Sequence, residues 1–197
     1  LISDGSAGDY FDRHDLTLLA DGLYFADGQI QDEVFVLGSF LQSKMHQAGV
    51  TCSNCHEPHS GQLLQVGNDL CATCHAPSVF DGIDHHGHPE GSEGAACVDC
   101  HMPSRTYMQV DDRRDHRFHV PDPLLSLEGG SPDPCMNCHE DKTHKWADEN
   151  IRAWHPEYTR RNIWAEPLSR VRSLDASAVD ELISEIGRAT TAPIIRA

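Results

Sequence analysis

The chain has 197 residues, of which 39% are hydrophobic and 7% aromatic, and a formal net charge of −16 at pH 7. A surface this acidic repels the phosphates of nucleic acids and anionic lipid headgroups, which excludes those binding functions and favours cationic partners. The supply of apolar side chains is thin for a core of this size, so the interior needs a further apolar component.

Residues 1–31 are polar and acidic, and several glycines interrupt any helical periodicity. We expect an irregular acidic lead here. The next segment, residues 32–48, is different, because Val34, Leu37, Leu41 and Met45 recur at near-helical spacing. Gly49 follows where a helix commonly ends. The sequence therefore predicts a helix over residues 32–48.

Residues 50–145 are rich in Gly, Pro, Asp and His and show no sustained periodicity. From residue 146 the chain turns helical again, with a short amphipathic helix up to Pro156 and a clearer one over residues 175–189, where Asp175 serves as N-cap. Pro193 is placed to open another helix. We divide the chain into a lead (1–31), a central domain (32–145) and a helical segment (146–197). This last segment is either a truncated helical repeat, a docking surface, or a set of helices that packs on the central domain.

One five-residue pattern, Cys-x-x-Cys-His, occurs four times and uses all eight cysteines of the chain. The four motifs pair Cys52 and Cys55 with His56, Cys71 and Cys74 with His75, Cys97 and Cys100 with His101, and Cys135 and Cys138 with His139. This pattern attaches c-type haem: both thiols bond covalently to the porphyrin, and the adjacent histidine ligates the iron from the proximal side.

Cys-x-x-Cys pairs also occur in zinc sites and in disulfides. Four Cys-x-x-Cys pairs could build two tetrathiolate zinc sites, but zinc does not require a histidine after each pair. Disulfides suit a secreted chain, but a two-residue gap gives a tight, reactive ring typical of redox catalysis. We therefore interpret the central domain as a tetrahaem domain wrapped around four covalent haems.

Four large apolar cofactors would also supply the missing core. The predicted fold is mainly α with extensive irregular chain and little or no β. Because c-type haem is attached outside the cytoplasm, we expect a periplasmic or extracellular protein. The chain has no apolar run long enough to span a membrane and does not open with a signal peptide, so we expect a mature or trimmed product.

The sixth iron ligand decides the chemistry, because a haem closed by two histidines suits electron transfer and an open iron can bind small molecules. Ten histidines remain beyond the motifs: His14, His46, His59, His85, His86, His88, His116, His119, His144 and His155. His46 lies at the predicted helix end before Cys52. His59 is too close to His56 to cap the same haem, so it would reach a neighbouring one.

The cluster His85-His86-Gly87-His88 is expected to supply one ligand, with His88 preferred, and one of His116 and His119 is expected to supply another. Met45 and Met102 could offer thioether ligands, but histidine is abundant.

The stretch that runs from Asp27 through Gly38–His46 to Cys52 resembles multihaem c-type cytochromes with doubled Cys-x-x-Cys-His motifs and C-terminal helical repeats. Residues 97–103, with Asp115 and His116 downstream, are also similar to part of the pentahaem nitrite reductase and hydroxylamine oxidoreductase superfamily. The resemblance covers about residues 22–147 and implies that the distal ligands are His46, His59, His88 and His116. It also implies a helical-repeat segment that starts again near residue 192. Further upstream motifs, a longer repeat array and a Cys-x-x-Cys-Lys motif, known from these families, are not found here.

The sequence thus predicts electron transfer along a row of four haems, each with two histidine ligands. Its partners would be other redox proteins or copies of itself, and exposed ends of the row would allow polymerisation into a filament. The alternative is a redox enzyme, or part of one, of the nitrite or hydroxylamine type with one open haem, where groups such as His119, Arg105 and Tyr107 would assist.

Overall fold

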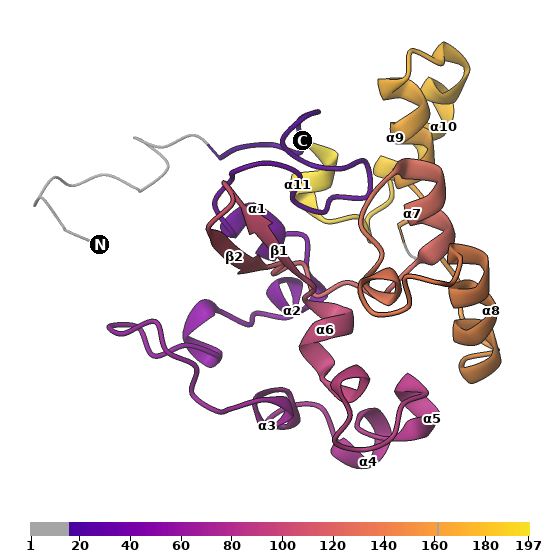
Figure 1. Cartoon of the computed structure of the whole chain (residues 1–197). Helices are drawn as coiled ribbons and strands as arrows, with labels where there is room; N and C mark the ends of the chain where they lie inside the picture. The colour runs from indigo at the N-terminus through magenta and orange to yellow at the C-terminus, as the bar shows by residue number, and fades with distance from the viewer. Residues whose placement is uncertain (1–15, 161) are drawn as a thin grey trace, which may run out of the picture.

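The computed structural model describes residues 16–160 and 162–197, so the first half of the acidic lead, including His14, lies outside the described residues. Short helices joined by irregular chain dominate the architecture (Figure 1). The α-helices are α1 (Leu37–Phe40), α2 (Lys44–Gln47), α3 (Asn68–Ala72), α4 (Pro77–Phe80), α5 (Ile83–His86), α6 (Cys97–His101), α7 (Pro123–Gly129), α8 (His144–Trp154), α9 (Ala165–Arg172), α10 (Val179–Ile186) and α11 (Pro193–Arg196). Short 3-10 helices are η2 (Cys52–Asn54), η3 (Glu93–Ala95), η4 (Pro134–Asn137) and η5 (Ala176–Ala178). The prediction of a mainly α fold is confirmed.

The expected helix over residues 32–48 is split into α1 and α2. Ser43 separates them, because its backbone is extended and its side chain accepts a hydrogen bond from the His46 amide, which makes it the N-cap of α2. The end of α2 agrees with the prediction. Gly49 has a positive φ of 88°, and its amide donates to the His46 carbonyl.

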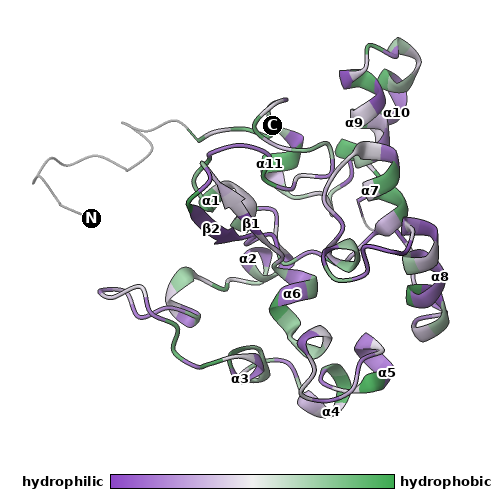
Figure 2. Ribbon diagram, in the orientation of Figure 1, coloured by the Kyte–Doolittle hydropathy of each residue, from purple (hydrophilic) through white to green (hydrophobic). Residues whose placement is uncertain are grey.

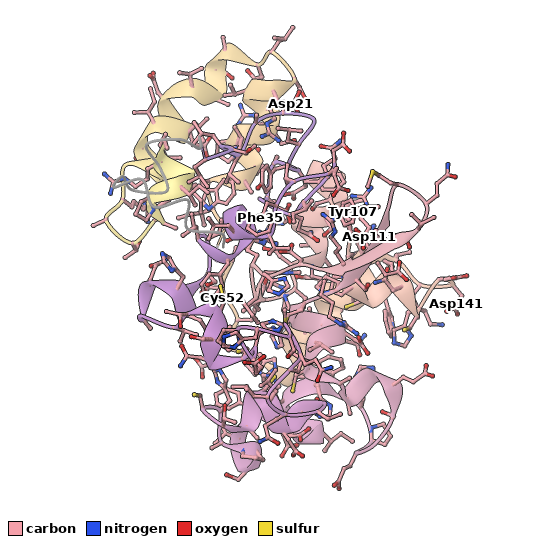
Figure 3. The ribbon with its side chains drawn as sticks, turned by 90° about the vertical axis from the view of Figure 1, so that its left-hand side faces the viewer. Asp21, Phe35, Cys52, Tyr107, Asp111 and Asp141 are labelled. Carbon is pink, nitrogen blue, oxygen red and sulfur yellow. The ribbon has the colours of Figure 1, made fainter. Side chains whose placement is uncertain are left out.

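One antiparallel hairpin joins β1 (Ser104–Tyr107) to β2 (Asp111–Arg114), with Tyr107 paired to Asp111 beside the turn (Figure 3). Of the three residues between the strands, Met108 and Gln109 have positive φ angles, 47° and 66°. Such turns match the twist of the strands, but they normally use Asn and Gly, so this one is strained. The hairpin agrees with the expectation of little β.

Among the described residues, the buried apolar side chains form two small clusters outside the motifs. The first contains Tyr24, Ile30, Val34 and Tyr107. The described part of the lead, residues 16–31, contains no helix, but most of residues 24–30 are buried, and Tyr24 is fully buried. Part of the lead is therefore core.

The second cluster, Leu125, Trp164 and Ala165, joins α7 to the C-terminal helices. Leu182 and Ile186 of α10 and Ile195 of α11 pack against this cluster, so α10 and α11 are joined to α7 through it (Figure 1). Asp175 is the N-cap of η5, which leads directly into α10, and accepts from the Ser177 amide; the helix expected over residues 175–189 is thus a 3-10 turn followed by an α-helix that ends at Ile186. In the described part of the chain, no helix has the length and apolarity needed to cross a membrane.

Candidate haem-binding sites

Each of the four motifs forms one tight helical turn. The amide of the motif histidine donates to the carbonyl of the first cysteine in three of them, at 2.9 Å for His56, 2.9 Å for His75 and 3.0 Å for His139. The motif of His101 is the helix α6 itself. Because residues three and four apart lie on one side of a helical turn, both thiols and the imidazole of a motif can face the same cofactor.

The motifs follow one another in space in the order of the sequence. Helix α6 contacts α3 on one side and η4 on the other, near the centre of the molecule (Figure 1). Burial and the neighbouring thiol of Cys71 raise the pKa of Cys97 to about 11. Burial also raises the pKa of Cys55, with Cys71 and Cys74 nearby. We number the motifs I to IV from the N-terminus, and they form a row with motif III between II and IV.

The eight cysteines stand as separate thiols in the described part of the chain. All eight cysteines are free thiols, so none of the pairs forms a disulfide. Within the described ranges, no three His, Cys, Asp or Glu side chains converge as a metal site.

The chain around the first two motifs has no core of its own. Between residues 44 and 94 no residue is buried. Large apolar side chains instead stand exposed there, among them Leu63, Val66, Val79, Phe80 and Ile83, which is 59% exposed. In Figure 2, green hydrophobic stretches lie along the ribbon around α3, α4 and α5, in the lower part of the view. A folded segment with exposed apolar side chains and no core fits a large apolar group such as haem, so the residues fit the cofactor that the motifs imply.

Three motif histidines each have a second imidazole nearby, at nearly the same distance between ring centres. Metal–imidazole bonds of about 2 Å put the ring centres of two imidazoles on opposite sides of one metal about 6 Å apart. The ring centres are 6.2 Å apart for His56 and His116, with the planes at 28°. They are 6.1 Å apart for His101 and His85, and 6.1 Å for His139 and His88.

Distance alone does not identify a ligand pair, because His86 and His88, neighbours on one loop, are also 6.2 Å apart. Hydrogen bonds at Nδ1 supply the further evidence, because they show how each ring is oriented. The Nδ1 atoms of His56, His101 and His116 lie 2.9, 2.8 and 2.9 Å from the backbone carbonyls of Gly61, His119 and Arg114. A ring that donates Nδ1–H to a carbonyl keeps Nε2 free for a metal, which is the usual arrangement of a histidine ligand.

Of the four distal ligands that the resemblance implies, His116 and His88 lie opposite motif histidines. His46 packs edge-on against Phe40 at 5.4 Å, and His59 is 94% exposed, with Nδ1 2.9 Å from Glu57. The ring contact of His75 is with Phe80, edge-on at 5.4 Å. Among the described residues, the ring contacts of His46, His59 and His75 are thus with other side chains, so ligation of a haem at His75 by His46 or His59 would require a change in side-chain position.

Sequence reasoning missed His85, because it expected one ligand from the cluster that holds His85 and His88. Here both rings lie opposite motif histidines, from the two ends of one short turn. Sequence reasoning also missed Asp133, whose side chain is fully buried and lies 2.8 Å from His144 Nδ1. The second oxygen of Asp133 accepts from the Cys135 amide at 3.0 Å, and its charge together with burial raises the pKa of Cys135. The Asp-Pro-Cys sequence before motif IV was the available signal.

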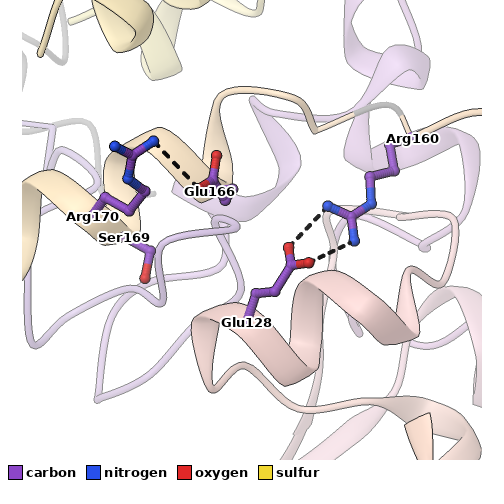
Figure 4. A pocket seen from close by; sticks show the side chains of 5 residues that line it. All are labelled: Glu128, Arg160, Glu166, Ser169 and Arg170. Carbon is purple, nitrogen blue, oxygen red and sulfur yellow. Dashed lines mark hydrogen bonds and ion pairs between the residues drawn. The ribbon is translucent and has the colours of Figure 1, made fainter. Parts of the chain in front are cut away.

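A cavity of about 410 Å³ lies apart from the motifs (Figure 4). Arg160 pairs with Glu128 at 2.9 Å, and Arg170 with Glu166 at 3.6 Å. Because its cations are already neutralised and no cysteine or histidine lines it, this cavity is not a haem site.

Two family models match the chain at the motifs. The cytochrome c552 family matches residues 84–167, and the doubled CXXCH motif family matches residues 45–80. Together the matched ranges include all four motifs. The chain is a multihaem c-type cytochrome.

Among solved structures, this cytochrome is similar to the outer cell wall cytochrome OcwA, with a TM-score of 0.50 and 17% sequence identity. The likeness covers 80% of this chain and 45% of that one, so the chain spans less than half the length of the protein it matches. At this identity the likeness speaks for the fold alone. No curated protein matches the sequence.

Proposed function

We propose that this cytochrome carries four c-type haems, one at each motif, and transfers electrons along the row that they form. Bound haem supplies a reversible one-electron couple at its iron. The observation that carries the proposal is the set of three facing imidazole pairs, since an iron closed on both sides by histidine suits electron transfer. The polypeptide would hold the spacing and orient the ligands, which tunes the potentials.

The proposed ligand pairs are His56 with His116, His101 with His85, and His139 with His88. Hydrogen bonds from Nδ1 to backbone carbonyls support Nε2 as the coordinating atom of both histidines in the first pair, of His101 in the second and of His88 in the third. For the motif of His75, we propose His46 and His59 as the candidate distal ligands, in line with the resemblance. The pairing of His85 with His101 differs from the four ligands expected from sequence.

A second function, a redox enzyme with one open haem, is favoured by one observation. The ring contact of His75 is with Phe80 and not with another imidazole. If the enzyme hypothesis is correct, motif II is the motif at which an added small ligand would bind.

We further propose a periplasmic or extracellular location. This rests on covalent haem attachment and on the printed name of the similar outer cell wall cytochrome. Given the net charge of −16, cationic redox proteins are the proposed partners. We also propose that copies assemble end to end into a filament, since a contact between two different ends of the chain builds an open fibre when its rotation does not close a ring.

Electron paramagnetic resonance of the oxidised holoprotein, with and without cyanide, tests the proposal. Four low-spin ferric signals that do not respond to cyanide are expected. His88→Ala and His116→Ala should each convert one haem to a high-spin form that binds cyanide. The control is Lys145→Ala, since the Lys145 side chain is 79% exposed and pairs with Glu149 at 4.0 Å on the surface of α8. A wild-type protein with a cyanide-binding high-spin haem would favour the enzyme, and unchanged spectra of both variants would contradict the proposed ligands.

A further inference from the structure

The segment of residues 114–119, which we name the bracket, touches two candidate haem sites. Near its start the His116 ring faces His56, and its Nδ1 lies 2.9 Å from the Arg114 carbonyl. At its end the backbone carbonyl of His119 lies 2.8 Å from Nδ1 of His101. The bracket therefore contributes an imidazole opposite the histidine of motif I and a hydrogen-bond acceptor to the histidine of motif III.

The start of the bracket is fastened to motif III. The Arg114 guanidinium donates to the Asp99 carboxylate at 3.0 Å and to the Met102 carbonyl at 3.1 Å. The amide of Asp115 donates to the Pro103 carbonyl at 3.1 Å. These contacts fix where the bracket begins, but they do not fix its end, where the acceptor for His101 lies.

Arg117 holds the end of the bracket. Its side chain is 5% exposed, and it bonds to the backbone carbonyl of Asp27 and pairs with the Asp27 carboxylate at 3.4 Å. The amide of Arg117 donates to Asp115 at 2.8 Å. The next residue, Phe118, has a φ of 51°, a conformation that side-chain-bearing residues rarely adopt unless their surroundings impose it.

The strained turn at Phe118 orients both functional groups of the bracket. The Phe118 ring packs edge-on against His116 at 6.1 Å, and the turn directs the next carbonyl toward His101. The hydrogen bond at Nδ1 sets the orientation and the basicity of a metal-bound imidazole, and basicity of the ligand sets the potential of the iron. Loosening Arg117 would thus change ligand geometry at motifs I and III together.

We propose that Arg117 is a positioning residue that sets the ligand geometry, and so the redox potentials, of the haems at motifs I and III as a pair. This inference rests on the proposed function, because it requires haem at both motifs. It extends that function, since one buried ion pair, Arg117 with Asp27, would set the ligand geometry of two haems in the row.

The test compares Arg117→Met and Arg117→Lys with a matched control, Arg172→Met, in the full-length holoprotein. Arg172 is also largely buried and holds the same N-terminal loop, by donating to the carbonyls of Tyr24 at 2.8 Å and Leu19 at 2.7 Å, but it makes no hydrogen bond to the bracket. The readouts are the low-spin resonance signals and a spectroelectrochemical titration. The signal of motif I is the one that His116→Ala removes.

In Arg117→Met we expect two of the four haem signals, including that of motif I, to shift in g-value and midpoint potential, and the other two to stay. Arg117→Lys keeps the charge and should shift the same two signals less. The control should lower stability without moving any signal. The inference is wrong if neither Arg117 variant moves the signals, if all four move, or if Arg172→Met moves the same two. A wild-type protein without four low-spin haems would instead refute the proposed function.

Discussion

Replacing Asp133 by alanine should destabilise the holoprotein by about 2–4 kcal/mol. The Asp133 side chain is fully buried and accepts from the Cys135 amide at 3.0 Å and from His144 Nδ1 at 2.8 Å. A hydrogen bond to a charged group contributes about 1.5–3 kcal/mol, and the cost of burying the carboxylate offsets part of the sum. The loss should fall on motif IV, because Asp133 is the cap of η4.

Guanidinium chloride unfolding at pH 7, followed by far-ultraviolet circular dichroism and by the haem absorbance, measures this loss. Asp133→Asn keeps one acceptor oxygen and should lie between the wild type and Asp133→Ala. The matched control is Asp141→Ala, because Asp141 pairs with Lys142 at 2.6 Å on the surface and should leave the midpoint unchanged. If Asp133→Ala unfolds at the same denaturant concentration as Asp141→Ala, the buried carboxylate does not hold motif IV.

Three further predictions concern the backbone and pH. Met108→Asn combined with Gln109→Gly suits the positive φ angles of the hairpin turn and should stabilise the protein by roughly 1 kcal/mol, seen as a higher thermal midpoint; an unchanged midpoint would mean that the turn stores no strain. Burial holds the pKa of His119 well below its ordinary value, so the folded state binds fewer protons than the unfolded state, and stability should fall as the pH drops below about 6.5. Unfolding at pH 7 and pH 5 checks this, and His119→Leu should reduce the difference; an equal difference in both proteins would contradict it. Gly87→Ala should lower the free energy of unfolding by about 1–3 kcal/mol, since Gly87 has a φ of 71° and its added methyl group would meet the indole of Trp154 at the end of α8. The control is Gly91→Ala, at a similar φ but in open space, which should lower it less. Equal losses in chemical unfolding would show that the indole contact does not matter.

The covalent part of the site was predictable from the sequence, because the Cys-x-x-Cys-His spacing fits within one helical turn. Local signals also worked where a short-range hydrogen bond decides the structure. Gly49 ends α2 and Asp175 caps the turn before α10, as their sequence positions predicted. The mainly α fold follows from the same local periodicities.

The distal side of the site was less predictable, because its contacts join residues far apart in the chain. His116 reaches His56 across sixty residues, and His85 reaches His101 from a different helix. The helix expected over residues 32–48 is broken because Ser43 caps the second half of it. The burial of Tyr24 was equally hidden, since it depends on Tyr107 of a distant hairpin and not on any pattern in the lead itself.

The central claim, that the chain holds one covalent haem at each motif, is tested most directly by the intact mass of the denatured holoprotein. The account predicts a single species at the 21.8 kDa of the polypeptide plus four haem groups. A mass that corresponds to the bare polypeptide, or to fewer than four haems in every preparation, would contradict it.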